Sequence, residues 1–314
     1  HTASDFENVI HNALRLPERT KLCYSLPCFF DPPSPPAFST LSTYSTSPRM
    51  FVTIITDCRD DNARSRQETR YAHLFPQMHV SFISATSDIE AAGNVIDVLD
   101  ASDDAPGVIA VNCAPRHGRA KKWKNGSPFG YAWVGNKLVI GTVEGFCLSL
   151  LKRFKLIQAV QVTDIEAALT AGGYTLSQID AAVHTQFRSL NYLPRLARIV
   201  WDKKNVNAQV LPVADIADLP SLVWWADSFG NCKTSITSIE CAFEAGDRKR
   251  VTFADTTSLE VLCVERLAEV PDGQTALIVG SSGLHDHRFV ELIIQGGSAS
   301  EKFGIRKGDP ISIS

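Results

Sequence analysis

The sequence has 314 residues, of which 44% are hydrophobic and 21% charged, so it has the composition of a globular protein and the length of about two domains. Lys and Arg number 31 against 34 Asp and Glu, which excludes the strong positive field that attracts nucleic acid or anionic membranes. No apolar run approaches the roughly 18 residues of a membrane-spanning helix. We therefore expect a soluble protein whose partner is a small molecule or another protein.

The first 49 residues differ in composition from the rest. They include the string DPPSPPAFSTLSTYSTSP, which is too rich in Pro, Ser and Thr to pack a core. A targeting peptide is the less favoured alternative, because such peptides are poor in acidic residues and Asp5, Glu7 and Glu18 are present. We expect residues 1–49 to form a disordered or linker-like extension.

From residue 50 to 212, strand and helix patterns alternate. Residues 51–56 (FVTIIT), 79–85 (HVSFISA) and 107–114 (GVIAVNCA) read as strands. Helical patterns lie between them at 61–75 and 87–101, and Ser87 or Asp88 can cap the second helix. This order predicts an α/β domain with a mainly parallel sheet covered by helices.

The pattern changes after residue 220. Short strands such as CKTSITSI, RVTFA, TALIVG and FVELIIQ are separated by Gly, Asp and Pro turns. We expect residues 221–314 to form a smaller, antiparallel, barrel-like β domain.

Eight cysteines are scattered along the chain without a CxxC pair, which excludes the usual zinc and thioredoxin-like sites. Such spacing is typical of buried thiols in a reducing compartment, so we expect a cytoplasmic protein. The pair His285 and His287 has no evident third ligand, and we predict no metal site there.

Five strings carry a resemblance to a known family. They are ITDCRDDNA, SDIEAAGNVIDVLDA, LVIGTVEGFCLSLL, WADSFGNCKTSI and IIQGGSASEKFGIRKGDP, and they occur in the family's order across residues 50–314. The chain resembles the S-adenosylmethionine (SAM) hydroxide adenosyltransferase and fluorinase/chlorinase family. The resemblance implies a nucleoside ligand bound between subunits of a homotrimer, with SAM as substrate or ligand and no further cofactor.

The same resemblance implies a set of binding residues. The Asp57 carboxylate falls on the family's ribose-binding aspartate, and the Phe229 ring on the aromatic that stacks on adenine. Turn formation is the alternative explanation for Asp57 and for the string from Asp227 to Asn231. The full binding set implied by the resemblance is Asp57, Asn62, Asp227, Phe229, Asn231, Ser282 and Ala299.

The residues expected to carry chemistry depart from the family's pattern. The hydrolase branch activates water with an Asp, an Arg and a His, but Ala114 and Pro115 stand where the Asp is expected. The family's Arg corresponds to Arg116 or Arg119, and Arg116 and Arg188 are candidates to hold an anionic nucleophile. Ser189 falls on the halide-contacting serine of the fluorinase, with a capping or turn serine as the alternative. Glu144 stands where the family has Asn.

Two functions follow from the resemblance. The first is an enzyme that displaces L-methionine from SAM by attack of water or halide at C5′, giving adenosine or a 5′-halo-adenosine. The second is a non-catalytic adenosine- or SAM-binding protein. A third possibility is a nucleoside or phosphate enzyme in which the basic string RHGRAKK contacts phosphate, against the alternative of a solvated basic loop.

Overall fold

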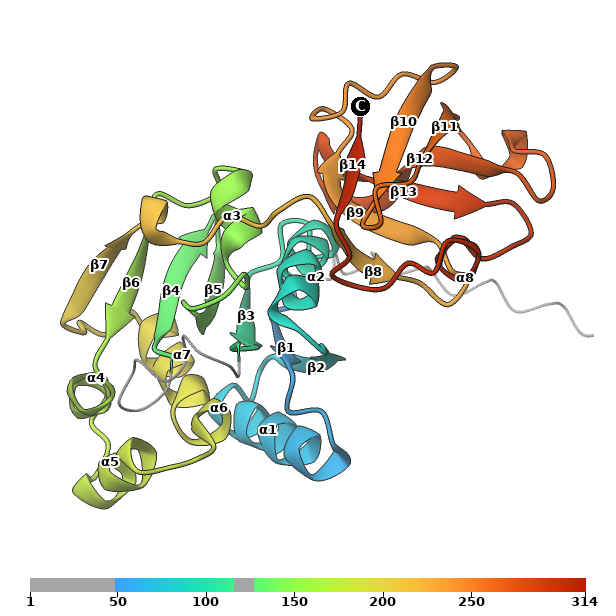
Figure 1. Ribbon diagram of the computed structural model, residues 1–314. Helices are drawn as coiled ribbons and strands as arrows, with labels where there is room; N and C mark the ends of the chain where they lie inside the picture. The colour runs from blue at the N-terminus through green and yellow to red at the C-terminus, as the bar shows by residue number, and fades with distance from the viewer. Residues whose placement is uncertain (1–48, 116–126) are drawn as a thin grey trace, which may run out of the picture. The chain divides into compact units, whose positions relative to one another are not determined.

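The computed structural model describes residues 49–115 and 127–314. The expected extension therefore lies almost entirely outside the described residues. Two seven-stranded sheets organise the described chain (Figure 1). The sheets belong to one compact unit, and none of the described helices is long and apolar enough to cross a membrane.

The N-terminal sheet has the strand order β2-β1-β3-β5-β4-β6-β7. Its pairings show that β2, β1, β3, β5 and β6 run in one direction, whereas β4 and β7 run opposite to them. The predicted mainly parallel sheet is confirmed. The strands are β1 (Phe51–Thr56), β2 (His79–Ser84), β3 (Gly107–Asn112), β4 (Phe129–Val134), β5 (Lys137–Thr142), β6 (Ala159–Thr163) and β7 (Ala208–Pro212).

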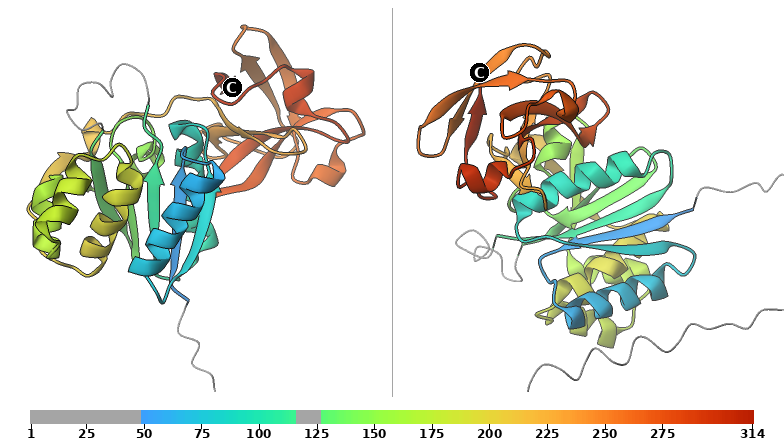
Figure 2. Two further views of the ribbon diagram at one scale, coloured as in Figure 1. Left: turned by 90° about the horizontal axis from the view of Figure 1, so that it is seen from below. Right: turned by 90° about the vertical axis from the view of Figure 1, so that its right-hand side faces the viewer.

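Helices cover both faces of this sheet (Figure 2). Because side chains alternate along a strand, Ile55 of β1 packs with α2 and α3, whereas Val52 and Ile54 pack with α1, α4, α5 and α7. The helices are α1 (Asp61–Leu74), α2 (Asp88–Ala101), α3 (Ser149–Arg153), α4 (Ile165–Gly172), α5 (Leu176–Val183), α6 (Arg188–Asn191) and α7 (Leu193–Trp201).

Polar side chains define where the longer helices begin. The Asp60 carboxylate accepts a hydrogen bond from the Ala63 N–H at the start of α1, and the Ser87 hydroxyl accepts one from the Glu90 N–H at the start of α2. Ser87 is thus the cap of α2. Asp88 instead accepts from the Phe146 N–H at 2.9 Å, and so ties the β5–α3 loop to α2.

The C-terminal sheet is mostly antiparallel, with the strand order β14-β10-β11-β12-β13-β9-β8 and a single parallel pair, β11 with β12, among its strand pairings. Its two edges meet where Leu222 bridges Pro310 and the Val223 N–H donates to the Asp309 carbonyl. The expected barrel-like β domain is confirmed. Its elements are β8 (Val223–Ala226), β9 (Cys232–Thr237), β10 (Arg248–Phe253), β11 (Ser258–Cys263), β12 (Thr275–Leu284), β13 (His287–Ile294), α8 (Ala299–Lys302) and β14 (Ile311–Ile313).

Helix α2 also contacts the C-terminal sheet. The Trp224 ring packs against Gly93, where an added Cβ would stand 2.3 Å from a ring carbon. Arg288 donates to both carboxylate oxygens of Asp100 at 2.8 Å, and Lys307 donates to Glu90. The acidic side chains of α2 thus meet basic side chains of the C-terminal domain.

Candidate functional site

A pocket of about 500 Å³ opens at the carboxyl ends of β1 and β3. It brings together Asp57, Arg188 and Ser189, which are far apart in the sequence. Ligands in open α/β sheets commonly bind at this end of the strands. The described lining consists of Asp57, Cys58, Asn112, Ala114, Pro115, Ser127, Gln186, Phe187, Arg188 and Ser189.

The loop that carries Asp57 is held by side chains from three elements. The Thr56 hydroxyl accepts from the Cys58 N–H at 3.1 Å and from the Asn112 side-chain amide of β3 at 3.2 Å. The buried Gln67 amide of α1 donates to the Cys58 carbonyl at 3.3 Å. These bonds fix the backbone on both sides of Asp57, so its carboxylate is presented on an ordered turn.

Arg188 brings positive charge to the same pocket. Its guanidinium lies over the Phe129 ring, with the central carbon 5.3 Å from the ring centroid. Burial lowers the pKa of Arg188, yet a guanidinium with so high an ordinary pKa stays charged at neutral pH. Ser189, at the start of α6, is buried beside it. The pocket thus combines a carboxylate, a cation and a hydroxyl.

The position of the missing family aspartate also lies in this pocket. Ala114 and Pro115 are in the lining, and Asp57 supplies its only carboxylate among the described residues. Arg116 lies outside the described residues. Just beneath the lining, burial raises the pKa of Cys147 to about 12 and raises the pKa of Cys113 as well. Both thiols are therefore protonated and packed in the core rather than available as nucleophiles.

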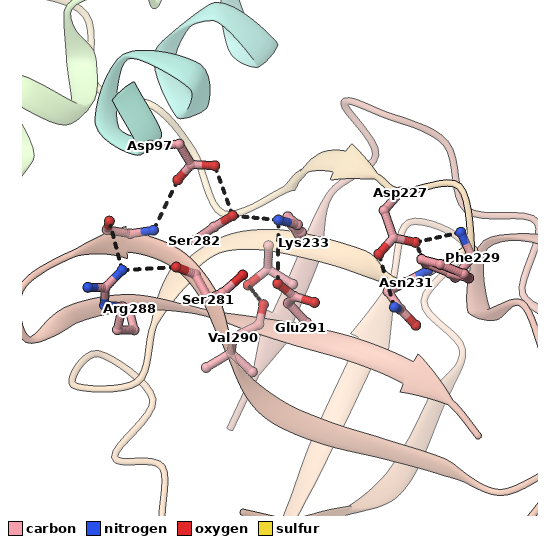
Figure 3. A network of polar contacts seen from close by, with 12 residues as sticks. Asp97, Asp227, Phe229, Asn231, Lys233, Ser281, Ser282, Arg288, Val290 and Glu291 are labelled. Atoms are coloured by element: carbon pink, nitrogen blue, oxygen red, sulfur yellow. Dashed lines mark hydrogen bonds and ion pairs between the residues drawn. The ribbon is translucent and has the colours of Figure 1, made fainter. Parts of the chain in front are cut away.

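The second group of predicted residues lies on the turn between β8 and β9. One Asp227 oxygen, Oδ1, accepts from the backbone N–H groups of Phe229 and Asn231, both at 2.9 Å (Figure 3). The other, Oδ2, accepts from the Asn231 side-chain amide at 3.0 Å. Asp227 therefore organises the turn, as the turn-forming alternative anticipated, and this role is compatible with contact to a ligand.

The turn is supported by α8 and presents an exposed aromatic ring. Gly230 has φ +82°, and an added Cβ would stand 2.0 Å from the Ser298 hydroxyl, so only glycine fits there. The Ser300 N–H donates to the Gly230 carbonyl at 3.0 Å, which places the α8 segment with the buried Ala299 against the turn. Phe229 is 76% exposed, although the backbone beneath it is ordered.

Two of the predicted binding residues, Asn62 and Ser282, lie neither in the described lining of the Asp57 pocket nor on the Asp227–Asn231 turn. Asn62 is exposed in the first turn of α1 and is not part of the described pocket lining. Ser282 is buried on β12, where its hydroxyl donates to Asp97 Oδ2 at 2.9 Å and accepts from Lys233 Nζ at 2.5 Å. Residues 285–286, which follow Ser282 closely, form the turn of the β12–β13 hairpin, with Leu284 paired to His287.

The histidines of this hairpin do not form part of a ligand cluster. The His287 ring stacks on Phe154, with ring centroids 4.7 Å apart. In the residues that the structure describes, no group of three or more His, Cys, Asp or Glu side chains is arranged to hold a metal ion.

The sequence reasoning missed the polar network beside the turn, around Lys233 of β9. Lys233, Glu291 and Asp97 lie there together with Ser282, and Lys233 Nζ is 3.8 Å from Glu291 Oε1 (Figure 3). Burial raises the pKa of both Glu291 and Asp97. The alternation along β9 was an available signal, because Cys232, Thr234 and Ile236 share one face and Lys233 takes the other.

Comparison with known proteins supports the resemblance. Residues 222–312 match the family model of the SAM hydroxide adenosyltransferase C-terminal domain. No curated protein matches the sequence.

Two solved structures are similar across 84% of this chain and 100% of their own. An uncharacterized conserved protein from Thermotoga maritima has 15% identity and a TM-score of 0.59, and a conserved hypothetical protein from Thermus thermophilus has 17% and 0.56. At these identities the likeness establishes a shared fold across both domains.

Proposed function

We propose that this protein binds SAM and displaces its methionine by attack of water or halide at C5′. The premise is the match of residues 222–312 to the SAM hydroxide adenosyltransferase C-terminal domain. The family match supports a SAM-related activity in general. The identity of the attacking group is the further step of the proposal.

The observation that carries the proposal is the pocket that combines Asp57, Arg188 and Ser189. An ionised carboxylate can accept hydrogen bonds from both hydroxyls of a ribose diol. Asp57 stands on an ordered turn at the carboxyl end of a parallel strand, and Arg188 and Ser189 supply a cation and a hydroxyl for an anionic or polar nucleophile. These groups suit a nucleoside with a reacting atom at one end.

The exposed ring of Phe229 supplies the other half of the proposed site. The described lining of the Asp57 pocket comes from residues 57–189, whereas Asp227, Phe229 and Asn231 lie on the C-terminal domain. We propose that the turn of a neighbouring subunit completes the pocket in a homotrimer. The ring then stacks on adenine, and Asp227 and Asn231 face the methionine end.

The reaction needs little acid or base. The bond from C5′ to the attacking water oxygen or chloride forms as the C5′–S bond breaks, the bonding pair moves to sulfur, and methionine leaves as a neutral thioether. When water attacks, it loses a proton to solvent and adenosine results; when chloride attacks, the product is 5′-chloro-5′-deoxyadenosine. Alignment and desolvation of the nucleophile supply most of the rate, because the sulfonium is already a good leaving group.

One observation favours a non-catalytic alternative. Ala114 and Pro115 line the pocket at the place where the hydrolase branch has its water-activating Asp. In this alternative the protein binds adenosine or SAM without turnover.

Incubation of the purified chain with SAM, with and without chloride, tests these functions. We expect methionine together with adenosine or chloroadenosine, and we expect both products to disappear in Asp57→Ala. Asp61→Ala is the matched control, because Asp61 is exposed in the first turn of α1 and outside the described lining. Binding by calorimetry without product would establish the alternative, and neither binding nor product would refute both.

A further inference from the structure

Lys233 lies where three parts of the structure meet. It follows the Asp227–Asn231 turn on β9, its ammonium donates to the Ser282 hydroxyl of β12, and that hydroxyl donates to Asp97 of α2 (Figure 3). The second Asp97 oxygen accepts from the Gly283 N–H at 3.1 Å. A continuous chain of hydrogen bonds therefore runs from α2 to the strand that leaves the turn.

Further contacts fix the Lys233 side chain in this place. Its ammonium lies 5.9 Å from the centroid of the Trp224 ring, on the strand that enters the turn, and 3.8 Å from Glu291 Oε1. The side chain is only 17% exposed. Glu291 is accommodated because residue 280 is glycine, where an added Cβ would stand 2.1 Å from Glu291 Oε1. Lys233 is thus in contact with both strands that flank the turn.

We propose that Lys233 is a positioning residue that, through Ser282 and Asp97, fixes the Asp227–Asn231 turn to helix α2. Buried, hydrogen-bonded charges are costly to desolvate, and their best-attested use is to specify one arrangement of the groups around them. The consequence for ligand binding rests on the proposed function. When α2 of the same chain holds the turn, the turn reaches the pocket of a neighbouring subunit in one orientation. The conformational entropy of the turn is therefore already lost before the ligand binds.

The test compares two contacts between α2 and the C-terminal sheet. Lys233→Met removes the ammonium and keeps the length of the side chain, and Ser282→Ala removes the connecting hydroxyl. Arg288→Gln is the matched control, because the Arg288 side chain also joins α2, through Asp100, and holds the carbonyls of Ser281 and Gly283, but makes no hydrogen bond or ion pair to a β9 side chain in the described residues. Ser282→Thr keeps the hydroxyl and serves as the conservative variant.

The first measurement is amide hydrogen exchange at Phe229 and Asn231, whose N–H groups bond to Asp227. We expect exchange at least about tenfold faster in Lys233→Met and Ser282→Ala, with Arg288→Gln and Ser282→Thr close to wild type. Unchanged exchange in Lys233→Met, or an equal acceleration in Arg288→Gln, overturns the proposal. This readout needs no SAM, so it decides the positioning role even if the proposed function fails.

The second measurement separates positioning from chemistry. We expect Lys233→Met to raise the KM or Kd for SAM about tenfold and to change kcat less than about twofold, because Lys233 is not assigned to the reacting atoms. A loss confined to kcat contradicts the positioning role.

Discussion

The two regions assigned to the candidate site are built in opposite ways. The Asp57 region is a pocket at the ends of parallel strands, and its carboxylate stands on a loop held by Thr56, Asn112 and Gln67. The Asp227 region is a turn that packs against the α8 segment and carries an exposed ring. The pocket supplies shape and charge, whereas the turn presents an ordered backbone with an exposed aromatic ring.

Of the variants that test this comparison, Asp57→Ala should have the largest effect on SAM affinity. Loss of two charge-assisted hydrogen bonds, each about 1.5–3 kcal/mol, predicts a loss of SAM affinity of at least about 100-fold by calorimetry. The fold should persist, which circular dichroism can check. Affinity within threefold of wild type would mean that the pocket is not the ribose site.

Phe229→Ala should have the next largest effect. Stacking of a base on an aromatic ring is worth about 1–3 kcal/mol, so SAM affinity should fall about 5- to 150-fold. Thermal stability should hardly change, because the ring is 76% exposed. Ile239→Ala is the control, since Ile239 is 58% exposed in the same domain and should leave affinity unchanged. Equal effects of the two variants would remove the special role of the turn.

The carboxyls of Glu291 and Asp97, near the turn, predict a smaller effect, which is a dependence of stability on pH. Burial raises the pKa of Glu291 and Asp97, so the folded protein holds their protons more tightly than the unfolded chain does. Their contribution to stability is present below about pH 4, the ordinary carboxyl range, and is lost as pH rises through the raised pKa values.

Glu291→Gln tests this pH dependence. As the pH rises from about 4 to 7, the free energy of unfolding should fall less steeply in the variant than in the wild type. Urea denaturation measures this fall, and Asp97 accounts for the part that remains. An unchanged slope would show that Glu291 does not titrate differently in the folded state.

Asn62→Ala should have the smallest effect. Asn62 is exposed in the first turn of α1 and outside the described lining of the pocket. We expect SAM affinity to change by less than about threefold, measured under the same conditions as Asp57→Ala. A loss comparable to that of Asp57→Ala would show that the site extends over the start of α1.

Local patterns predicted much of this architecture. The strand of residues 51–56 and the helix predicted over residues 87–101 depend on neighbouring residues and were readable from the sequence, which left its cap open between Ser87 and Asp88. The reversed directions of β4 and β7 could not be read from the sequence, because connections and pairing decide the direction of a strand and periodicity does not.

The site was also predictable only in part, because local patterns do not show which distant residues meet. Short strings identified Asp57 and the turn from Asp227 to Asn231. The hydrogen bonds of Ser282 join residues 185 and 49 positions away, and no local pattern indicates such partners. Long-range polar contacts of this kind follow from packing, which determines which side chains meet.

The closure of the C-terminal barrel has a consequence for synthesis of the protein. In the described residues, the backbone at Leu222 and at Val223, the first residue of β8, pairs on one side with residues 308–311. At a translation rate of about 5–20 residues per second, this edge leaves the ribosome several seconds before its partner exists. Strand β9 follows β8 closely and can pair with its other edge during that interval, so the edge of β8 at Val223 is the part left open to pairing with another nascent chain.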